Sequence, residues 1–263
     1  MADQKLDLAD IRQQDAQALA AGYTLRMRIF EITGITAFLA LIAVLIARMA
    51  MPARTAPWLV AGAVFLGFLA ADFVSGFVHW LADTWGATDM PVLGSAFIRP
   101  FREHHVDQEA ITRHDFIETN GANSIISVPV AVGALFIPLH TPVGLFACAF
   151  LTSMILWVFG TNQAHKWAHM AQPPALIATL QRLNLVLPRG HHSIHHSAPF
   201  NRYYCITVGW LNYPLRKIRF FETLEWIITA TTGALPRQDD LGEIAARAIA
   251  PLPATVKTEP RLP

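Results

Sequence analysis

Charged side chains and cysteines are scarce in this chain, and their scarcity excludes several classes of protein. Asp, Glu, Lys and Arg make up 15% of the 263 residues, whereas soluble domains average about 25%. The formal net charge is only +1, so nothing indicates nucleic acid as a partner. The two cysteines, Cys148 and Cys205, form no CxxC motif, which argues against a disulfide framework or a cysteine-rich zinc site.

Apolar residues take the place of the missing charge, at 53% of the chain with a mean hydropathy of +0.36. Four stretches approach the roughly 17–25 residues that cross a bilayer as a helix: residues 30–51, 58–78, 124–140 and 143–159. Residues 218–233 repeat apolar side chains at helical spacing, which predicts an amphipathic helix lying in the membrane interface. The N-terminus lacks the basic start, apolar stretch and cleavage site of a signal peptide.

These patterns predict an all-α integral membrane protein with four transmembrane helices. We expect an N-terminal segment at residues 1–29, a membrane domain at 30–240 and a mobile tail at 241–263. The turns on one side of the spans carry only Arg48 and Arg54, and the remaining lysines and arginines lie on the other side. Because basic residues accumulate in the cytoplasm, we expect both termini there. The membrane would be the cytoplasmic membrane in a bacterium and the endoplasmic reticulum in a eukaryote.

Histidine is the unusual residue type, with eleven copies. His140 stands alone and is interpreted as a core residue, whereas the others cluster on the predicted cytoplasmic side and form a histidine-rich cap. The clusters lie in the segments HWLAD, FREHH, TNQAHKWAH and GHHSIHH, with one more histidine after FREHH. The candidate metal ligands are His79, Asp83, His104, His105, His114, His165, His169, His191, His192, His195 and His196.

The spacing of these residues favours a site for two metal ions. His79 and Asp83 are four residues apart, as are His165 and His169, so each pair shares a helix face. Neutral imidazole is a good ligand for Fe, Zn, Cu and Ni. Carboxylate di-iron bundles use glutamates instead, and structural zinc sites close with four ligands, often cysteines. A ferrous pair held by many histidines can activate dioxygen against an unactivated C–H bond.

Several individual roles stay open. His191 fits either a position near the metal or a solvent-facing one. His114 fits a ligand that Glu118, four residues on, would orient, and Asp83 fits a ligand or a hydrogen-bond partner of one. Asp72 lies within the second predicted span, where a charge is costly. It is expected either to form a hydrogen bond within the bundle or to be a paired structural residue.

Four strings within residues 60–240 resemble the plasmanylethanolamine desaturases, whose bacterial relatives are known as CarF-like, and more distantly the plastid phosphatidylglycerol desaturases: FVHWLADTWG, FIRPFREHHVDQEAITRHDFIETNG, TNQAHKWAH and LPRGHHSIHHSAPFNRYYCITVGWLNYPL. The histidine boxes of this family fall on His165 with His169, and on His192 with His195 and His196. The resemblance implies a catalytic set made of His79, His104, His105, His165, His169, His192, His195 and His196.

The resemblance also implies an activity. Such enzymes convert a 1-O-alkyl ether phospholipid in the membrane to its 1-O-alk-1'-enyl form, a plasmalogen. They would use two iron ions (Fe2+/Fe3+), dioxygen, and an electron donor such as cytochrome b5 or ferredoxin with its reductase. Two alternatives remain: desaturation or hydroxylation of an acyl chain in another phospholipid, and a non-enzymatic metal-binding regulator of carotenoid synthesis or the light response.

Overall fold

The computed structural model describes residues 14, 16–17, 21–87, 90–91, 94, 98–197 and 201–236. Every regular element in these ranges is a helix, which confirms the all-α prediction. The tail predicted at residues 241–263 and most of the predicted N-terminal segment lie outside the described residues.

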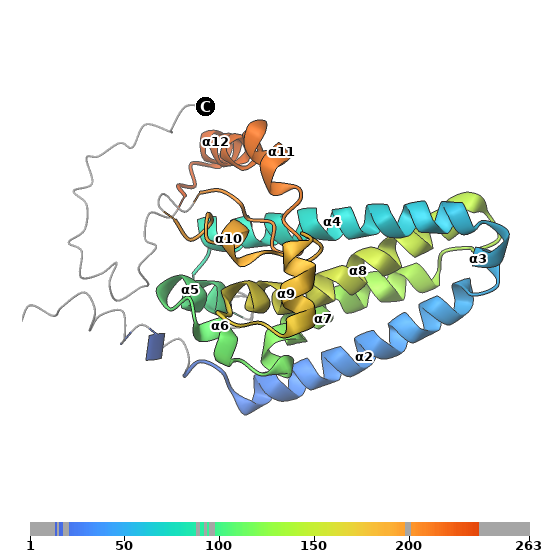
Figure 1. Ribbon diagram of the computed structural model, residues 1–263, viewed down its shortest axis with the longest axis horizontal. Helices are drawn as coiled ribbons and strands as arrows, with labels where there is room; N and C mark the ends of the chain where they lie inside the picture. The colour runs from blue at the N-terminus through green and yellow to red at the C-terminus, as the bar shows by residue number, and fades with distance from the viewer. Residues whose placement is uncertain are drawn as a thin grey trace, which may run out of the picture.

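Four long helices run along the length of the molecule (Figure 1): α2 (Leu25–Met49), α4 (Pro57–Thr84), α7 (Phe116–Leu135) and α8 (Pro142–His169). α4 packs against α8, α2 packs against α7, and α7 also packs against α8. Phe38, Leu45 and Leu145 are buried in the apolar core between them. By length and composition, α2, α4 and α8 are able to cross a membrane.

α4 and α8 are longer than the apolar stretches from which they were predicted. Each has 28 residues, or about 42 Å at a rise of about 1.5 Å per residue, whereas the hydrocarbon core of a bilayer is about 30 Å thick. The last turns of both helices therefore have length to spare beyond the apolar region. These turns carry the HWLAD and AHKWAH segments, so the predicted helical pairing of their side chains is present.

α7 begins at Phe116, earlier than the predicted start at residue 124. Asp115 explains the difference, because its carboxylate accepts hydrogen bonds from the backbone N–H groups of residues 117 and 118 and thereby caps the helix. The first turns are polar, and hydropathy alone does not reveal them. α7 ends at Leu135, so His140 is exposed in the following turn, and its interpretation as a core residue was wrong.

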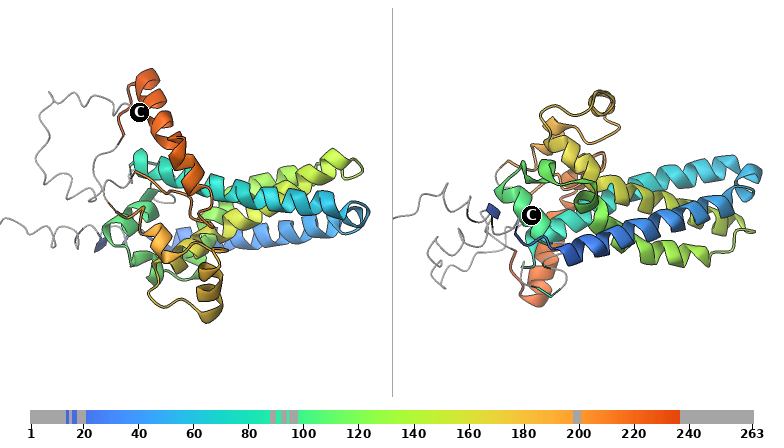
Figure 2. Two further views of the ribbon diagram at one scale, coloured as in Figure 1. Left: turned by 45° about the horizontal axis from the view of Figure 1, so that its top comes forward. Right: turned by 90° about the horizontal axis from the view of Figure 1, so that it is seen from below.

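Short helices gather near the end of the bundle where α4 and α8 finish (Figure 1). They are α5 (Arg99–Val106), α6 (Ala110–Arg113), α9 (Ala175–Arg182), α10 (Arg189–His192), α11 (Asn212–Lys217) and α12 (Phe220–Thr232). α3 (Pro52–Thr55) forms the turn between α2 and α4 at the opposite end. Figure 2 shows α9 and α12 projecting from opposite sides of the bundle.

α12 corresponds to the amphipathic segment predicted at residues 218–233. Its Phe221 is buried against Trp80 of α4, with the ring centroids 5.4 Å apart. Trp226 and Ile227, in contrast, are exposed. One face of α12 is therefore fastened to the end of α4, and another presents apolar side chains outward.

The closest approach of α4 and α8 gives a prediction about packing. A Cβ atom added at Gly67 would overlap the backbone oxygen of Phe150, whereas one added at Gly62 of the same helix meets open space. We expect Gly67→Ala to lower the free energy of unfolding by at least about 2 kcal/mol, because α4 and α8 must move apart. Gly62→Ala should be neutral or stabilise by up to about 1 kcal/mol, since alanine favours helix more than glycine does. Thermal unfolding in detergent compares the two variants, and equal midpoints would contradict the packing.

Candidate metal centre

The first cluster of side chains surrounds the carboxylate of Asp83 in the last turn of α4. Its Oδ2 atom lies 3.2 Å from Nε2 of His79, one turn earlier, and 3.2 Å from Nε2 of His105 on α5. His195, which follows α10, brings its Nε2 to 3.4 Å from the same oxygen and 3.3 Å from Nε2 of His105. These four residues form the first cluster.

The second cluster lies at the end of α8 and consists of His165, His169, His192 and His196. Nε2 of His192 lies 2.9 Å from Nε2 of His165, 3.0 Å from that of His169 and 3.0 Å from that of His196. His165 and His169 face the same way one helical turn apart, with their Nε2 atoms separated by 3.1 Å. The four ring nitrogens therefore converge on one small volume.

His104 on α5 lies between the two clusters. Its ring centroid is 5.5 Å from that of His79 in the first cluster and 4.8 Å from that of His165 in the second. Its ligand nitrogen lies within 4.8 Å of the corresponding atoms of three residues in each cluster. With His104, the structure brings together nine of the eleven predicted ligands, four in each cluster and one between.

Backbone carbonyl groups determine which nitrogen of these rings carries the proton. Nδ1 of His79 lies 3.1 Å from the carbonyl oxygen of Tyr204, and Nδ1 of His195 lies 3.0 Å from that of Arg202. Nδ1 of His104 makes a similar contact of 3.3 Å within its own helix. Because a carbonyl oxygen only accepts, each Nδ1 donates. In the neutral rings, Nε2 then presents a lone pair.

This arrangement fits metal ions better than it fits hydrogen bonds among the side chains themselves. In a neutral ring whose Nδ1 donates, the Nε2 atoms of His79 and His195 have no proton to give the Asp83 carboxylate that they face, and a cation placed between these groups would satisfy the lone pairs on both sides. Ligands about 2.1 Å from one ion stand about 3.0 Å apart at right angles, which matches the 2.9–3.1 Å spacing in the second cluster. Nε2 of His104 is buried and has no hydrogen-bond partner among the described residues.

Asp72 holds in place the segment that supplies two of these carbonyls. Its side chain is buried in α4. The carboxylate accepts hydrogen bonds of 2.9 Å from the N–H groups of Val208 and Gly209, and one of 3.0 Å from that of Leu211. The bonded residues follow directly on the stretch that contacts His79 and His195. The hydrogen bond within the bundle, one of the two roles expected of Asp72, is therefore confirmed.

Burial keeps His104, His192 and His196 neutral. The pKa values of His104, His192 and His196 are lowered from the ordinary value of about 6.5, first because burial disfavours the charged ring and then because neighbouring imidazoles repel it. A neutral ring has the lone pair that metal binding requires.

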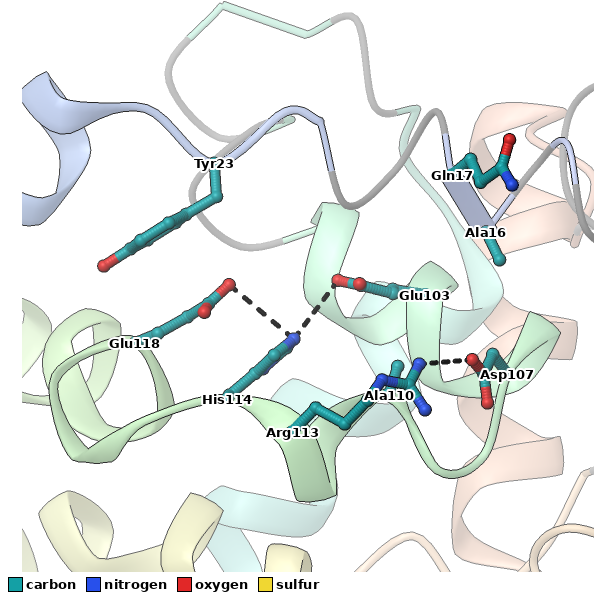
Figure 3. A pocket seen from close by; sticks show the side chains of 9 residues that line it. All are labelled: Ala16, Gln17, Tyr23, Glu103, Asp107, Ala110, Arg113, His114 and Glu118. Atoms are coloured by element: carbon teal, nitrogen blue, oxygen red, sulfur yellow. Dashed lines mark hydrogen bonds and ion pairs between the residues drawn. The ribbon is translucent and has the colours of Figure 1, made fainter.

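The structure places His114 outside both clusters. Its Nε2 lies 3.6 Å from a carboxylate oxygen of Glu103 and 3.6 Å from one of Glu118. Glu118 thus faces His114, as the four-residue spacing predicts. Sequence reasoning did not single out Glu103, although it stands next to His104 and points away from the clusters toward His114 (Figure 3).

His191 also lies outside both clusters. Its Nε2 is 3.0 Å from the side-chain nitrogen of Asn212, and the Asn212 side chain binds both the N–H and the C=O group of Cys205. His191 therefore braces the same segment that Asp72 holds. Sequence reasoning missed Asn212, because a single asparagine among apolar residues follows no pattern.

Replacing the Asp72 carboxylate tests whether it positions the first cluster. In Asp72→Asn an amide N–H group must face one of the backbone donors, so at least one hydrogen bond is lost. We expect the free energy of unfolding to fall by about 2–4 kcal/mol and the metal content of the purified protein to fall as well. Metal analysis and thermal unfolding check this, and full metal content at wild-type stability would show that Asp72 does not position the ligands.

Acidification gives a second test of the site. The unfolded chain binds protons at His104, His192 and His196 near pH 6.5, whereas the folded chain binds them only at lower pH because burial lowers these pKa values. The free energy of unfolding therefore falls as the pH drops below about 6.5. Protons also compete with metal for the imidazoles. We expect bound metal and the unfolding midpoint to decline together between about pH 7 and pH 5. A metal content that is constant over this range would contradict ligation by these histidines.

Comparison with known proteins places this geometry in a family. The chain is 59% identical over 239 residues to the plasmanylethanolamine desaturase of Myxococcus xanthus, which covers 91% of this chain and 85% of that protein. It is 45% identical over 235 residues to plasmanylethanolamine desaturase 1 of Mus musculus, covering 86% of each chain. Fatty acid desaturase 4, chloroplastic, of Arabidopsis thaliana is 33% identical over 181 residues, or 66% of this chain and 53% of that protein.

No solved structure matches the chain. A family model described as the lipid desaturase domain matches residues 68–239, a range that contains both clusters and His104. These likenesses confirm the resemblance drawn from the sequence motifs. The chain belongs to the lipid desaturase family.

Proposed function

We propose that this chain is a plasmanylethanolamine desaturase, which converts the 1-O-alkyl chain of an ethanolamine ether phospholipid to the 1-O-alk-1'-enyl chain of a plasmalogen. The observation that carries the proposal is the pair of buried clusters that share His104. They occur in a chain that is 59% and 45% identical to two proteins named for this activity. Two adjacent metal sites suit a reaction in which dioxygen is reduced fully to water.

The proposed cofactor is a pair of iron ions. Asp83, His79, His105 and His195 would hold one ion, the four histidines of the second cluster would hold the other, and His104 stands within reach of both. When bound, the iron pair would activate dioxygen and remove two hydrogens from the lipid chain. His114 and His191 would not bind iron, because each has other partners.

The electrons balance with one external donor. Reduction of one dioxygen to two waters takes four electrons and four protons. Two electrons and two protons leave the lipid with the hydrogens on carbons 1' and 2'. A donor such as cytochrome b5 or ferredoxin with its reductase supplies the other two electrons, and the other two protons come from the solvent. The protein itself excludes water, since His79 and His195 are 0% exposed, and it fixes the ring orientations through the carbonyl groups described above.

We further propose a topology with four spans and both termini in the cytoplasm. α7 would be the fourth span, because it packs between α2 and α8 along their length. The short helices and the metal centre would then form a cytoplasmic cap. The exposed apolar face of α12 would lie in the membrane interface, and residues 30–240 would form the desaturase domain.

Expression in a bacterium that lacks plasmalogens tests the reaction. Cells fed 1-O-alkylglycerol and supplied with an electron donor should produce acid-labile alkenyl phospholipid, detected by mass spectrometry. His195→Ala should lower the yield by at least about 100-fold, because one metal ligand is lost. His140→Ala is the matched control, since His140 is exposed at the opposite end of the bundle, and it should leave the yield unchanged.

The same extracts decide between this function and the alternatives. The extracts could contain a new acyl double bond or hydroxyl group but no vinyl ether, although the ether lipid is incorporated. That result would show that the substrate is an acyl chain and not an ether chain. Vinyl ether that persists in His195→Ala would overturn the proposed metal centre.

A further inference from the structure

A polar cavity of about 460 Å³ has Glu103 of α5 in its wall, one residue before His104 (Figure 3). Among the residues that line it are Tyr23, Glu103, Asp107, Arg113, His114 and Glu118. They come from the chain just before α2, from α5 and α6, and from the first turn of α7. The metal-site residues are not among those that line it, so the cavity is a separate feature of the fold.

The charges around this cavity favour a cationic ligand. Arg99 pairs with Glu103 at 2.8 Å and with Glu118 at 3.5 Å, so one guanidinium serves two carboxylates. The Glu103 side chain is only 5% exposed, and a buried carboxylate needs hydrogen-bond donors and positive charge. The same two carboxylates also face Nε2 of His114, at 3.6 Å each. Counting the lining residue Asp107, three carboxylates stand around the cavity against the guanidinium groups of Arg99 and Arg113 and this one imidazole, and a cationic ligand suits this excess of acidic groups. Tyr23 adds an aromatic ring at this wall, and Arg99 already stands 5.8 Å from its centroid.

A basic group lies at the rim of the same cavity. Arg113 is 60% exposed and pairs with Asp107. Its guanidinium can turn toward a phosphate, which it would bind through two parallel N–H groups. The cavity thus offers carboxylates for a cation and, nearby, a guanidinium for an anion.

We propose that this cavity binds the phosphoethanolamine headgroup of the lipid substrate, with the ammonium group at Glu103 and Glu118 and the phosphate at Arg113. The inference rests on the proposed function and identifies the part of the lipid that the protein recognises. An ethanolamine ammonium has three N–H groups to donate to the carboxylates, whereas the trimethylammonium of choline has none and is larger. A site whose carboxylates accept hydrogen bonds from the ligand discriminates against an analogue that lacks the donors, because the buried acceptors of the site are then left unpaired.

The chemistry of the substrate requires a headgroup site close to the metal. The reacting carbon is bonded to the ether oxygen, so about ten covalent bonds separate it from the headgroup nitrogen, or roughly 12 Å at full extension with bonds of about 1.5 Å. The chain connects the cavity to the metal centre at two points. Glu103 in its wall directly precedes His104, and Lys166, which follows His165, donates a hydrogen bond to the carbonyl group of His114.

Glu118→Gln tests the proposal, because it removes one negative charge and leaves the pair between Arg99 and Glu103. Glu109→Gln is the matched control, since Glu109 is an exposed carboxylate at the start of α6 outside the cavity. Purified full-length protein is assayed with its electron donor on ethanolamine and choline ether lipids of the same chains. We expect the wild type and Glu109→Gln to prefer the ethanolamine lipid by at least about 10-fold in kcat/KM. Glu118→Gln should lose most of this preference through a higher KM, with kcat little changed.

A binding measurement that needs no turnover accompanies the assay. Glycerophosphoethanolamine should raise the unfolding midpoint of the wild type and of Glu109→Gln but not that of Glu118→Gln, and glycerophosphocholine should have no effect on any of them. In the wild type alone, glycerophosphoethanolamine should also compete with the lipid by raising its KM. The competition measurement uses the wild type alone, so it tests the site even if Glu118→Gln folds poorly.

The outcomes separate this inference from the proposed function. Vinyl ether formed equally from both headgroups by the wild type would overturn the headgroup site and leave the reaction standing. A preference that survives in Glu118→Gln, or one that Glu109→Gln loses equally, would overturn it as well. Absence of vinyl ether from every lipid would overturn the proposed function, and glycerophosphoethanolamine binding would then be judged on the unfolding midpoints alone.

Discussion

The metal centre depends on a single buried carboxylate that makes no contact with any metal ligand. Asp72 sits inside the bundle and accepts three backbone N–H groups from a segment 136 to 139 residues further along the chain. Burying a carboxylate is costly, and the three donors offset that cost. Once the segment is fixed, the carbonyl groups of Tyr204 and Arg202 set the rings of His79 and His195. The orientation of the first cluster thus follows from an interaction within the membrane bundle.

α5 separates a region lined by neutral imidazoles from a region lined by carboxylates. On one side, neutral imidazoles converge with their lone pairs turned inward, and they suit a metal cation. On the other, Glu103 and Glu118 face the guanidinium of Arg99 and the imidazole of His114, and they form the proposed site for an organic cation. Glu103 and His104 are consecutive residues that serve the two regions separately, because neighbours on a helix point about 100° apart. In the proposed reaction, this proximity would let a headgroup bound on one side of α5 position the ether-linked carbon on the other.

Local patterns in the sequence predicted local parts of the site. The four-residue spacing of His79 with Asp83, and of His165 with His169, was enough to place each pair on one helix face. The apolar stretches likewise located the long helices, although α7 starts earlier because Asp115 caps it, and an aspartate three residues before a glutamate was a signal available in the sequence. Contacts between distant segments gave no such pattern. The position of His104 between the clusters depends on how α5 packs against α4, and the carboxylate contacts of His114 depend on how α6 packs against α5 and α8.

The long separation between Asp72 and its partners has a consequence for biosynthesis. The ribosome makes well over a hundred residues after Asp72 before the N–H groups of Val208, Gly209 and Leu211 exist. Throughout that interval α4 carries an unsatisfied carboxylate that the lipid phase disfavours by a few kcal/mol. The nascent helix therefore needs shelter from the insertion machinery or from α8 until that segment has been made. His192, His195 and His196 are also made more than a hundred residues after Asp72, so neither proposed metal site would have all its residues before then.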